Sequence, residues 1–323
     1  MKNKKKINEL LGSDDKPIKL SELDAELAKS VTAPDAGVKD GNPEDDKVKV
    51  NKEAPVSVGS LSPAQKEVIP IKALSFALGY LSNKQPNLDE MEAIVSSDMY
   101  IMDGHHRWAA ATLVDPNKQV KVAKIEMKAI DLITTLNVYT KGALNLGGNK
   151  GEGDLTKWKE LIKVEIEKAF EKGFSKENGN GILPGGKENW PMFSGGKGKT
   201  AEEVKELFGK IPGADGDAEK GKQLMIVNSD KLKTTRLLQA PERIDMPVID
   251  AGKTPTGEKT TDVKQSQLYD VCDKIATGKL DLKVPYTKEV SDKLGGEKTT
   301  TDLPTKESRI IKTYEKFIQK YKK

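Results

Sequence analysis

Residues 99–114 have the sequence MYIMDGHHRWAAATLV, and this stretch indicates the kind of fold that the chain forms. With residues 93–98 before it, it contains two short runs of strand-forming side chains separated by a Ser-Asp step, which is typical of a tight hairpin. The alanines that follow favour a helix, and Pro116 ends it because proline cannot donate the next backbone hydrogen bond. The stretch therefore predicts a strand, a turn at Asp103 and Gly104, and a helix in succession.

Patterns on both sides of this stretch predict further strands and helices. A strand is expected at 56–58, and residues 120–125 alternate apolar and polar side chains as a half-buried strand does. Helices are expected at 73–81, at about 130–141 and at 155–170. The last helix has an apolar stripe directed toward a core, formed by Trp158, Leu161, Ile162 and Ile166. The predicted fold class is α/β (α+β), a small mixed sheet with helices.

Three local features carry more specific predictions. Thr200 and Glu203 have the spacing of a capping box, which starts a helix. Residues 243–249 are expected to form an edge strand, because Pro247 has no N–H to donate within a central ladder. Cys272 is expected on the face of an ordinary helix, since free cysteine is among the most buried residue types.

Composition divides the chain into four expected parts. Apolar residues make up 36% and aromatic residues 5% of the 323 residues, and the mean hydropathy is −0.60, which favours a folded core with polar flanks. We expect a polar, largely extended arm at 1–55 and a core at 56–130. Helical additions and a closing strand of the same domain are expected at 131–252, and a polar linker with amphipathic helices at 253–323.

Charge and hydropathy limit the classes of partner. The net charge of +4 is the difference between 54 basic and 50 acidic residues, so DNA is permitted as a partner but not indicated. No apolar run of about eighteen residues is present, and the basic N-terminus is not followed by an apolar signal region. We therefore expect a cytoplasmic protein that is neither secreted nor membrane-spanning.

Histidine and arginine are concentrated in one place. The only two histidines of the chain are His105 and His106, and Arg107 beside them is one of only four arginines. A guanidinium group binds two phosphate oxygens at once, whereas lysine is a point charge, so an arginine in a lysine-rich chain indicates a geometric requirement. The alternative is a satisfied turn with two polar surface histidines.

The predicted helix start adds to the case for an anion site. Backbone N–H groups of Gly104, His105 and His106 would lie at the positive end of the helix dipole, where an anion is favoured. Asp103 has two candidate roles at this point. It could cap the helix by accepting a hydrogen bond from His105 or His106, or it could bind the magnesium ion that accompanies a nucleotide.

Residues 101–110, IMDGHHRWAA, closely resemble the Asp-Gly-His-His-Arg box of ParB-like and sulfiredoxin-like domains. That superfamily includes free-serine kinases and ParB-like proteins of tailed phages. The resemblance extends over residues 56–127. It implies a small α/β fold that holds ATP, ADP or CTP by its phosphates, together with magnesium, and uses the box as the clamp.

The resemblance also implies candidate catalytic residues. Kinase-like members have an acidic residue in the loop after the first strand, and Glu67, beside Lys66, occupies that place. Phosphoryl transfer needs a base for the attacking hydroxyl and cations for the phosphates, and Glu67, His106 and Arg107 would meet these needs. The candidate catalytic residues are therefore Glu67, His106 and Asp103. The alternative for Glu67 is a solvated loop carboxylate.

Three functions follow as hypotheses. The first is an ATP- or ADP-dependent phosphotransferase acting on a small hydroxyl substrate or a protein side chain. The second is a ParB-like nuclease or a nucleotide-gated DNA-binding protein, although no helix-turn-helix follows the box. The third is a phage virion-associated protein that retains the domain and binds phage structural proteins through its termini. Sulfiredoxin-type sulfur chemistry is not expected, because the box contains no cysteine.

Overall fold

A mixed five-stranded sheet forms the centre of the protein. The structure is a computed structural model that describes residues 44, 46–82, 88–140, 157–175, 198–237, 243 and 246–280. The strands are β1 (Val50–Ser57), β2 (Ser62–Pro63), β3 (Glu90–Ser96), β4 (Tyr100–Asp103) and β5 (Gln119–Ile125). Their order is β1-β5-β3-β4-β2, with β1/β5 and β3/β4 antiparallel and β3/β5 and β2/β4 parallel. The predicted α/β class with a small mixed sheet is confirmed.

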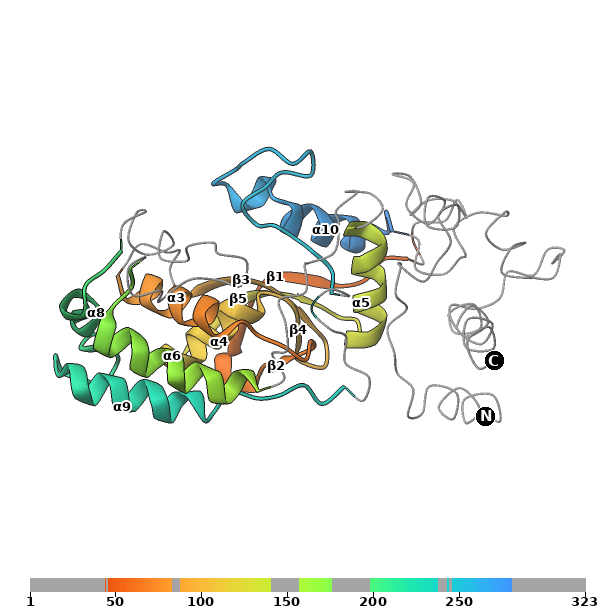
Figure 1. The fold of residues 1–323 in the computed structure, drawn as a ribbon. Coiled ribbons are helices and arrows are strands. Elements are labelled where there is room, and N and C mark those ends of the chain that lie inside the picture. Colours follow the sequence, from red (N-terminus) through yellow and green to blue (C-terminus); the bar gives the residue numbers. More distant parts are fainter. Residues whose placement is uncertain are drawn as a thin grey trace, which may run out of the picture.

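Helices cover both faces of this sheet (Figure 1). One face carries α3 (Pro70–Leu81), α4 (His105–Val114), α6 (Trp158–Lys172), α8 (Ala201–Phe208) and α9 (Ala218–Ser229). The other face carries α5 (Ala129–Val138) and α10 (Gln267–Ala276). Two short 3-10 helices, η3 (Val58–Ser60) and η6 (Val263–Gln265), complete the regular elements of the described residues.

Side-chain alternation along the strands divides the interior into two cores. In β4, Ile101 packs into the core beneath α3 and α4, whereas Met102 packs into the core beneath α5 and α10. In β5, Val122 and Ala123 divide in the same way. Successive side chains of a strand point to opposite faces, so each strand serves both layers. A three-layer fold results, with β4 leading directly into α4.

The predicted local features around β4 are present. Strands β3 and β4 form the predicted antiparallel hairpin, and the Ser96 hydroxyl accepts a hydrogen bond from Tyr100 N at 2.9 Å across its turn. Helix α4 ends at Val114, before Pro116. The capping box of α8 is also confirmed, since Glu203 N donates to Thr200 Oγ1 at 3.3 Å and Thr200 N donates to Glu203 Oε2 at 2.8 Å.

Three expected boundaries or orientations are wrong. Strand β1 begins at Val50, so the boundary of the arm at residue 55 is too late. Of the strand expected at 243–249, Arg243 and residues 246–249 form none, since Met246 N donates to Arg243 O at 3.3 Å in a turn, and residues 244 and 245 lie outside the described residues. On α6, Trp158, Ile162 and Ile166 are buried as expected, but Leu161 is 40% exposed.

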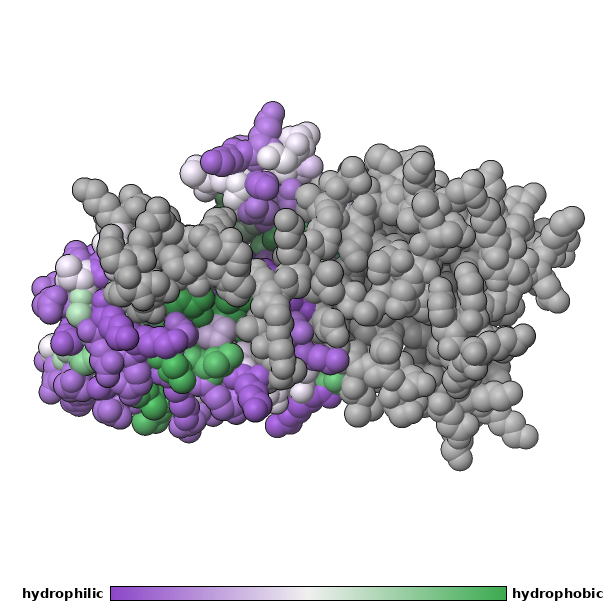
Figure 2. Space-filling model, viewed as in Figure 1, coloured by the Kyte–Doolittle hydropathy of each residue, from purple (hydrophilic) through white to green (hydrophobic). Residues whose placement is uncertain are grey.

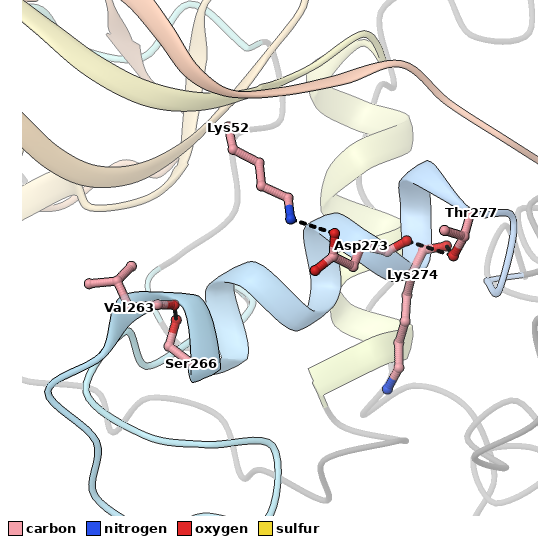
Figure 3. A network of polar contacts seen from close by, with 6 residues as sticks. All are labelled: Lys52, Val263, Ser266, Asp273, Lys274 and Thr277. Carbon is pink, nitrogen blue, oxygen red and sulfur yellow. Dashed lines mark hydrogen bonds and ion pairs between the residues drawn. The ribbon is translucent and has the colours of Figure 1, made fainter.

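Helix α10 shows that the fold continues beyond the expected boundary at residue 252. Its apolar face is buried in the second core, and Lys52 of β1 forms an ion pair with Asp273 (Figure 3). Val48 N donates to Ile275 O at 3.2 Å, which joins the two ends of the described chain. Cys272 is buried on this helix as predicted, and burial raises the pKa of its thiol to about 12. The expected helices beyond residue 280 and the glycine-rich segment at 176–197 lie outside the described residues.

The outer surface near α6 and α9 is mostly polar. Figure 2 shows hydrophobic patches among hydrophilic side chains on this face, and Val164 and Val227 are 46% and 54% exposed. Ion pairs join the two helices, among them Lys163 with Asp230 at 2.6 Å. Among the helices that the structure describes, none has the length and apolarity needed to cross a membrane.

Candidate functional site

Gly104 shapes the start of α4. Its φ of 100° is in the left-handed region, and a Cβ at this position would lie 2.7 Å from the Cβ of Ala93. Only glycine fits both conditions. The first hydrogen bond within the helix runs from Trp108 N to Gly104 O at 2.8 Å. The N–H groups of His105, His106 and Arg107 therefore have no partner within the helix, and they lie at its positive end.

Asp103 does not cap this helix, contrary to the first of its two predicted roles. The N-cap is Gly104, and no side chain caps the helix. Asp103 is the last residue of β4, and its Oδ2 accepts a hydrogen bond from Arg107 Nη2 at 3.0 Å. Burial raises the pKa of the Asp103 carboxyl, and the positive charges of Arg107 and Lys72 oppose this rise. A buried carboxyl with a raised pKa beside a cation is typical of functional sites.

The two histidines hold the loop that precedes α3. His105 Nε2 accepts a hydrogen bond from Ala64 N at 3.2 Å, and His106 Nε2 accepts one from Ile69 N at 3.1 Å. Burial lowers the pKa of His105 to about 3 and that of His106 well below its usual value. Both rings are therefore neutral with the proton on Nδ1. The alternative of two surface histidines is wrong for His105, which is 5% exposed.

These hydrogen bonds restrict what His106 can do chemically. Its Nε2 is already an acceptor for the backbone of Ile69, so it could take up a proton only by releasing the loop. The Nδ1–H group remains a neutral donor. His106 therefore suits binding of an anion better than the catalytic proton transfer predicted for it.

A cavity of about 280 Å³ opens beside the start of α4. It is lined by Gln65, Lys72, Phe76, Met102, Asp103, Gly104, His105, His106, Arg107, Arg243, Met246, Pro247, Val248, Ile249, Asp250 and Ala251. Five of the seven predicted site residues, from Asp103 to Arg107, are thus brought together. The lining combines three cationic side chains, two carboxylates and an apolar wall formed largely by residues 246–249.

Glu67 and Lys66 are not brought to this cavity. Lys66 is exposed, and Glu67 Oε2 accepts a hydrogen bond from Arg243 N at 2.8 Å. The Glu67 carboxylate thereby fixes the backbone of Arg243, whose side chain belongs to the lining. The predicted roles of Glu67 as the base and Lys66 as a phosphate ligand find no support in this geometry, and Glu67 is also not a merely solvated carboxylate.

The chain was compared with family models, curated proteins and solved structures. No match was found in any of the three. The resemblance to ParB-like and sulfiredoxin-like domains therefore remains a prediction that rests on residues 101–110.

Sequence reasoning missed Lys72, Arg243, Asp250 and Glu92. Arg243 carried a signal, because the scarcity of arginine that singles out Arg107 applies equally to it. Lys72 lies in the first turn of α3, where nothing in the local pattern distinguishes it from a surface lysine. Asp250 lines the cavity, and Glu92 lies outside the lining but pairs with Arg107 at 3.5 Å. Both are brought there by the packing of distant segments, and no local pattern marks them.

The donor set provides no complete magnesium site of its own. The described residues contain no group of three histidine, cysteine, aspartate or glutamate side chains that could hold a metal ion. Asp103, the predicted ligand, is already bonded to Arg107. Magnesium commonly binds through one or two carboxylates together with phosphates and water. The predicted ion would therefore have to take most of its ligands from a nucleotide.

Proposed function

We propose that this chain binds a nucleoside di- or triphosphate at the start of α4 and transfers a phosphoryl group to a small hydroxyl compound or a protein side chain. One observation carries the proposal. Residues of the first turn of α4, whose backbone N–H groups have no partner within the helix, line one cavity together with Lys72 and Arg243. A helix start with added cations is a suitable binding site for phosphate groups.

The cavity has a polar part suited to phosphate groups and an apolar part suited to a nucleoside. Backbone N–H groups of His105 and His106 would donate to phosphate oxygens, and Lys72 and Arg243 would offset their charge. The apolar wall, which includes Phe76 and residues 246–249, suits the nucleoside part of the ligand. Since both imidazoles are neutral, their contribution would be hydrogen bonding and not charge.

Asp103 is the best candidate for the catalytic base. Phosphoryl transfer needs a carboxylate that orients the attacking hydroxyl and accepts its proton. Asp103 lines the cavity and its pKa is raised by burial, whereas Glu67 lies outside the lining. Magnesium bound with the phosphates would reduce their charge repulsion toward this carboxylate.

Nucleotide binding and product analysis test the proposal. The full chain is titrated with ATP, ADP and CTP, with and without magnesium, and compared with the variants Lys72→Ala and Arg107→Lys. Both variants should weaken binding about tenfold or more, because each removes a cation or a bidentate contact. Lys66→Ala is the matched control and should bind as the parent does, since Lys66 is exposed and outside the cavity. Equal affinities in all four proteins would overturn the proposed site.

The same preparation separates the two alternative functions. Cleavage of DNA without phosphoryl transfer to an acceptor would favour the nuclease. Nucleotide-dependent retention on DNA without cleavage would favour a DNA-binding role. The virion-associated alternative depends on termini outside the described residues, and it remains a prediction.

A further inference from the structure

Glu92 has a strained backbone within the central strand β3. Its φ is 45°, in the left-handed region, which is unfavourable for a residue with a side chain. The pairing register of β3 with β5 shifts between Glu90 and Ile94, so Glu92 lies in a bulged part of the strand. Bulges of this kind redirect a side chain and are frequent beside functional sites.

The redirected side chain reaches Arg107. Glu92 Oε2 lies 3.5 Å from Arg107 Nη1, and Asp103 Oδ2 lies 3.0 Å from Arg107 Nη2. All three side chains are about four-fifths buried, with 18–20% of their surface exposed. Arg107 Nε is buried as well, and no acceptor for it is present among the described residues. Two carboxylates, one at each terminal nitrogen, therefore fix the guanidinium.

The two carboxylates hold Arg107 from different sides. Asp103 lines the cavity together with Arg107, whereas Glu92 is not part of the lining. An anion entering the cavity can therefore replace Asp103 at the guanidinium while Glu92 keeps its contact. The charges of Arg107 and Glu92 both act on the Tyr80 hydroxyl of α3, and burial raises its pKa to about 12, so it stays neutral.

We propose that Glu92 is a positioning residue that anchors Arg107 from behind the cavity, so that the guanidinium keeps its orientation when a phosphate group takes the place of Asp103. This role rests on the proposed function, because it concerns the arginine that would contact the phosphates. It accounts for a strained non-glycine residue in a central strand, which has no other evident use there.

A double-mutant cycle with ADP as the probe tests the anchor. Glu92→Gly removes the carboxylate and also relieves the positive φ, so the variant is expected to fold. It should weaken ADP binding about tenfold, a coupling typical of residues in contact. Glu92→Gln keeps an acceptor at the same place and should stay within about threefold of the parent. Glu90→Gln, on the exposed start of β3, is the matched control and should bind as the parent does.

Removing Arg107 distinguishes a positioning role of Glu92 from a general structural one. In an Arg107→Ala background, Glu92→Gly should have no further effect on ADP affinity, because there is no guanidinium left to position. An equal loss in both backgrounds, or unchanged affinity in Glu92→Gly, would overturn the anchor.

A ligand-free measurement separates failure of the anchor from failure of the proposed function. The Nε–H signal of Arg107 in nitrogen-15 NMR should be sharp and slow to exchange in the parent and in Glu92→Gln. It should broaden or exchange rapidly in Glu92→Gly. If the variants differ in this way but the parent binds no nucleotide, the anchoring role of Glu92 stands and the proposed function is refuted. A signal that is identical in all three proteins would refute the anchor.

Discussion

Acid should destabilise the fold through the two buried histidines. The folded protein keeps His105 neutral until about pH 3, whereas an unfolded chain protonates it near pH 6.5. His106 is shifted in the same direction. Between these values the unfolded state binds more protons than the folded state, so the free energy of unfolding falls as the pH falls. The stability is fully present above about pH 6.5 and is lost progressively below it.

The size of the effect follows from the linkage relation. From pH 7 to pH 5.5 the shifted pKa of His105 should cost about 1 kcal/mol of unfolding free energy, and His106 should add to this loss in the same direction. Asp103 acts in the opposite direction at lower pH, because burial raises its pKa and the folded state takes up its proton first. A variant that keeps Asp103 but lacks both imidazoles isolates the histidine contribution.

Urea unfolding at pH 7, 6 and 5.5 measures this contribution. The double variant His105→Gln/His106→Gln keeps a side-chain acceptor for the loop at each position but cannot be protonated. The parent should lose at least about 1 kcal/mol more than the double variant between pH 7 and pH 5.5. The same pH dependence in both proteins would show that the imidazoles do not hold the loop as neutral acceptors.

Three further outcomes are expected. Gly104→Ala should lower the free energy of unfolding by about 2–4 kcal/mol, because it adds a strained φ and a close contact. Thermal unfolding measures this loss, and a clearly smaller loss would contradict the geometry at Gly104. Glu67→Gln should keep any phosphoryl transfer activity, while Glu67→Ala should reduce nucleotide affinity by releasing Arg243. If Glu67 were the general base, both variants would instead lose turnover by about 10²–10⁴-fold. Cys272 should resist thiol reagents in the folded protein and react only in denaturant, so rapid labelling of the native chain would contradict its burial.

Much of the fold around the site could be predicted because its signals are local. The hairpin, the end of α4 before Pro116 and the capping box at Thr200 each depend on residues within a few positions. The boundaries were harder to predict. Strand β1 begins with polar residues such as Asn51 and Lys52, since an edge strand with one solvated face has few apolar side chains.

The site could be predicted only in part. The box from Asp103 to Arg107 is continuous in sequence, so its convergence on one cavity follows from a single helix start. The detailed roles were not accessible, because the partners of the histidines and of Glu67 are set by tertiary contacts with residues 64–69 and with Arg243. The capping role of Asp103 failed because Gly104 adopts the left-handed conformation and becomes the N-cap itself.

A backbone amide NMR titration of the full chain with ADP tests phosphate binding at the start of α4 directly. We expect the amide signals of His105, His106 and Arg107 to shift downfield and saturate together, because their N–H groups would donate to phosphate oxygens. The shifts should be absent with adenosine, which has no phosphate. Saturable ADP binding that leaves these three amides unchanged, or no saturable binding at all, would contradict the claim.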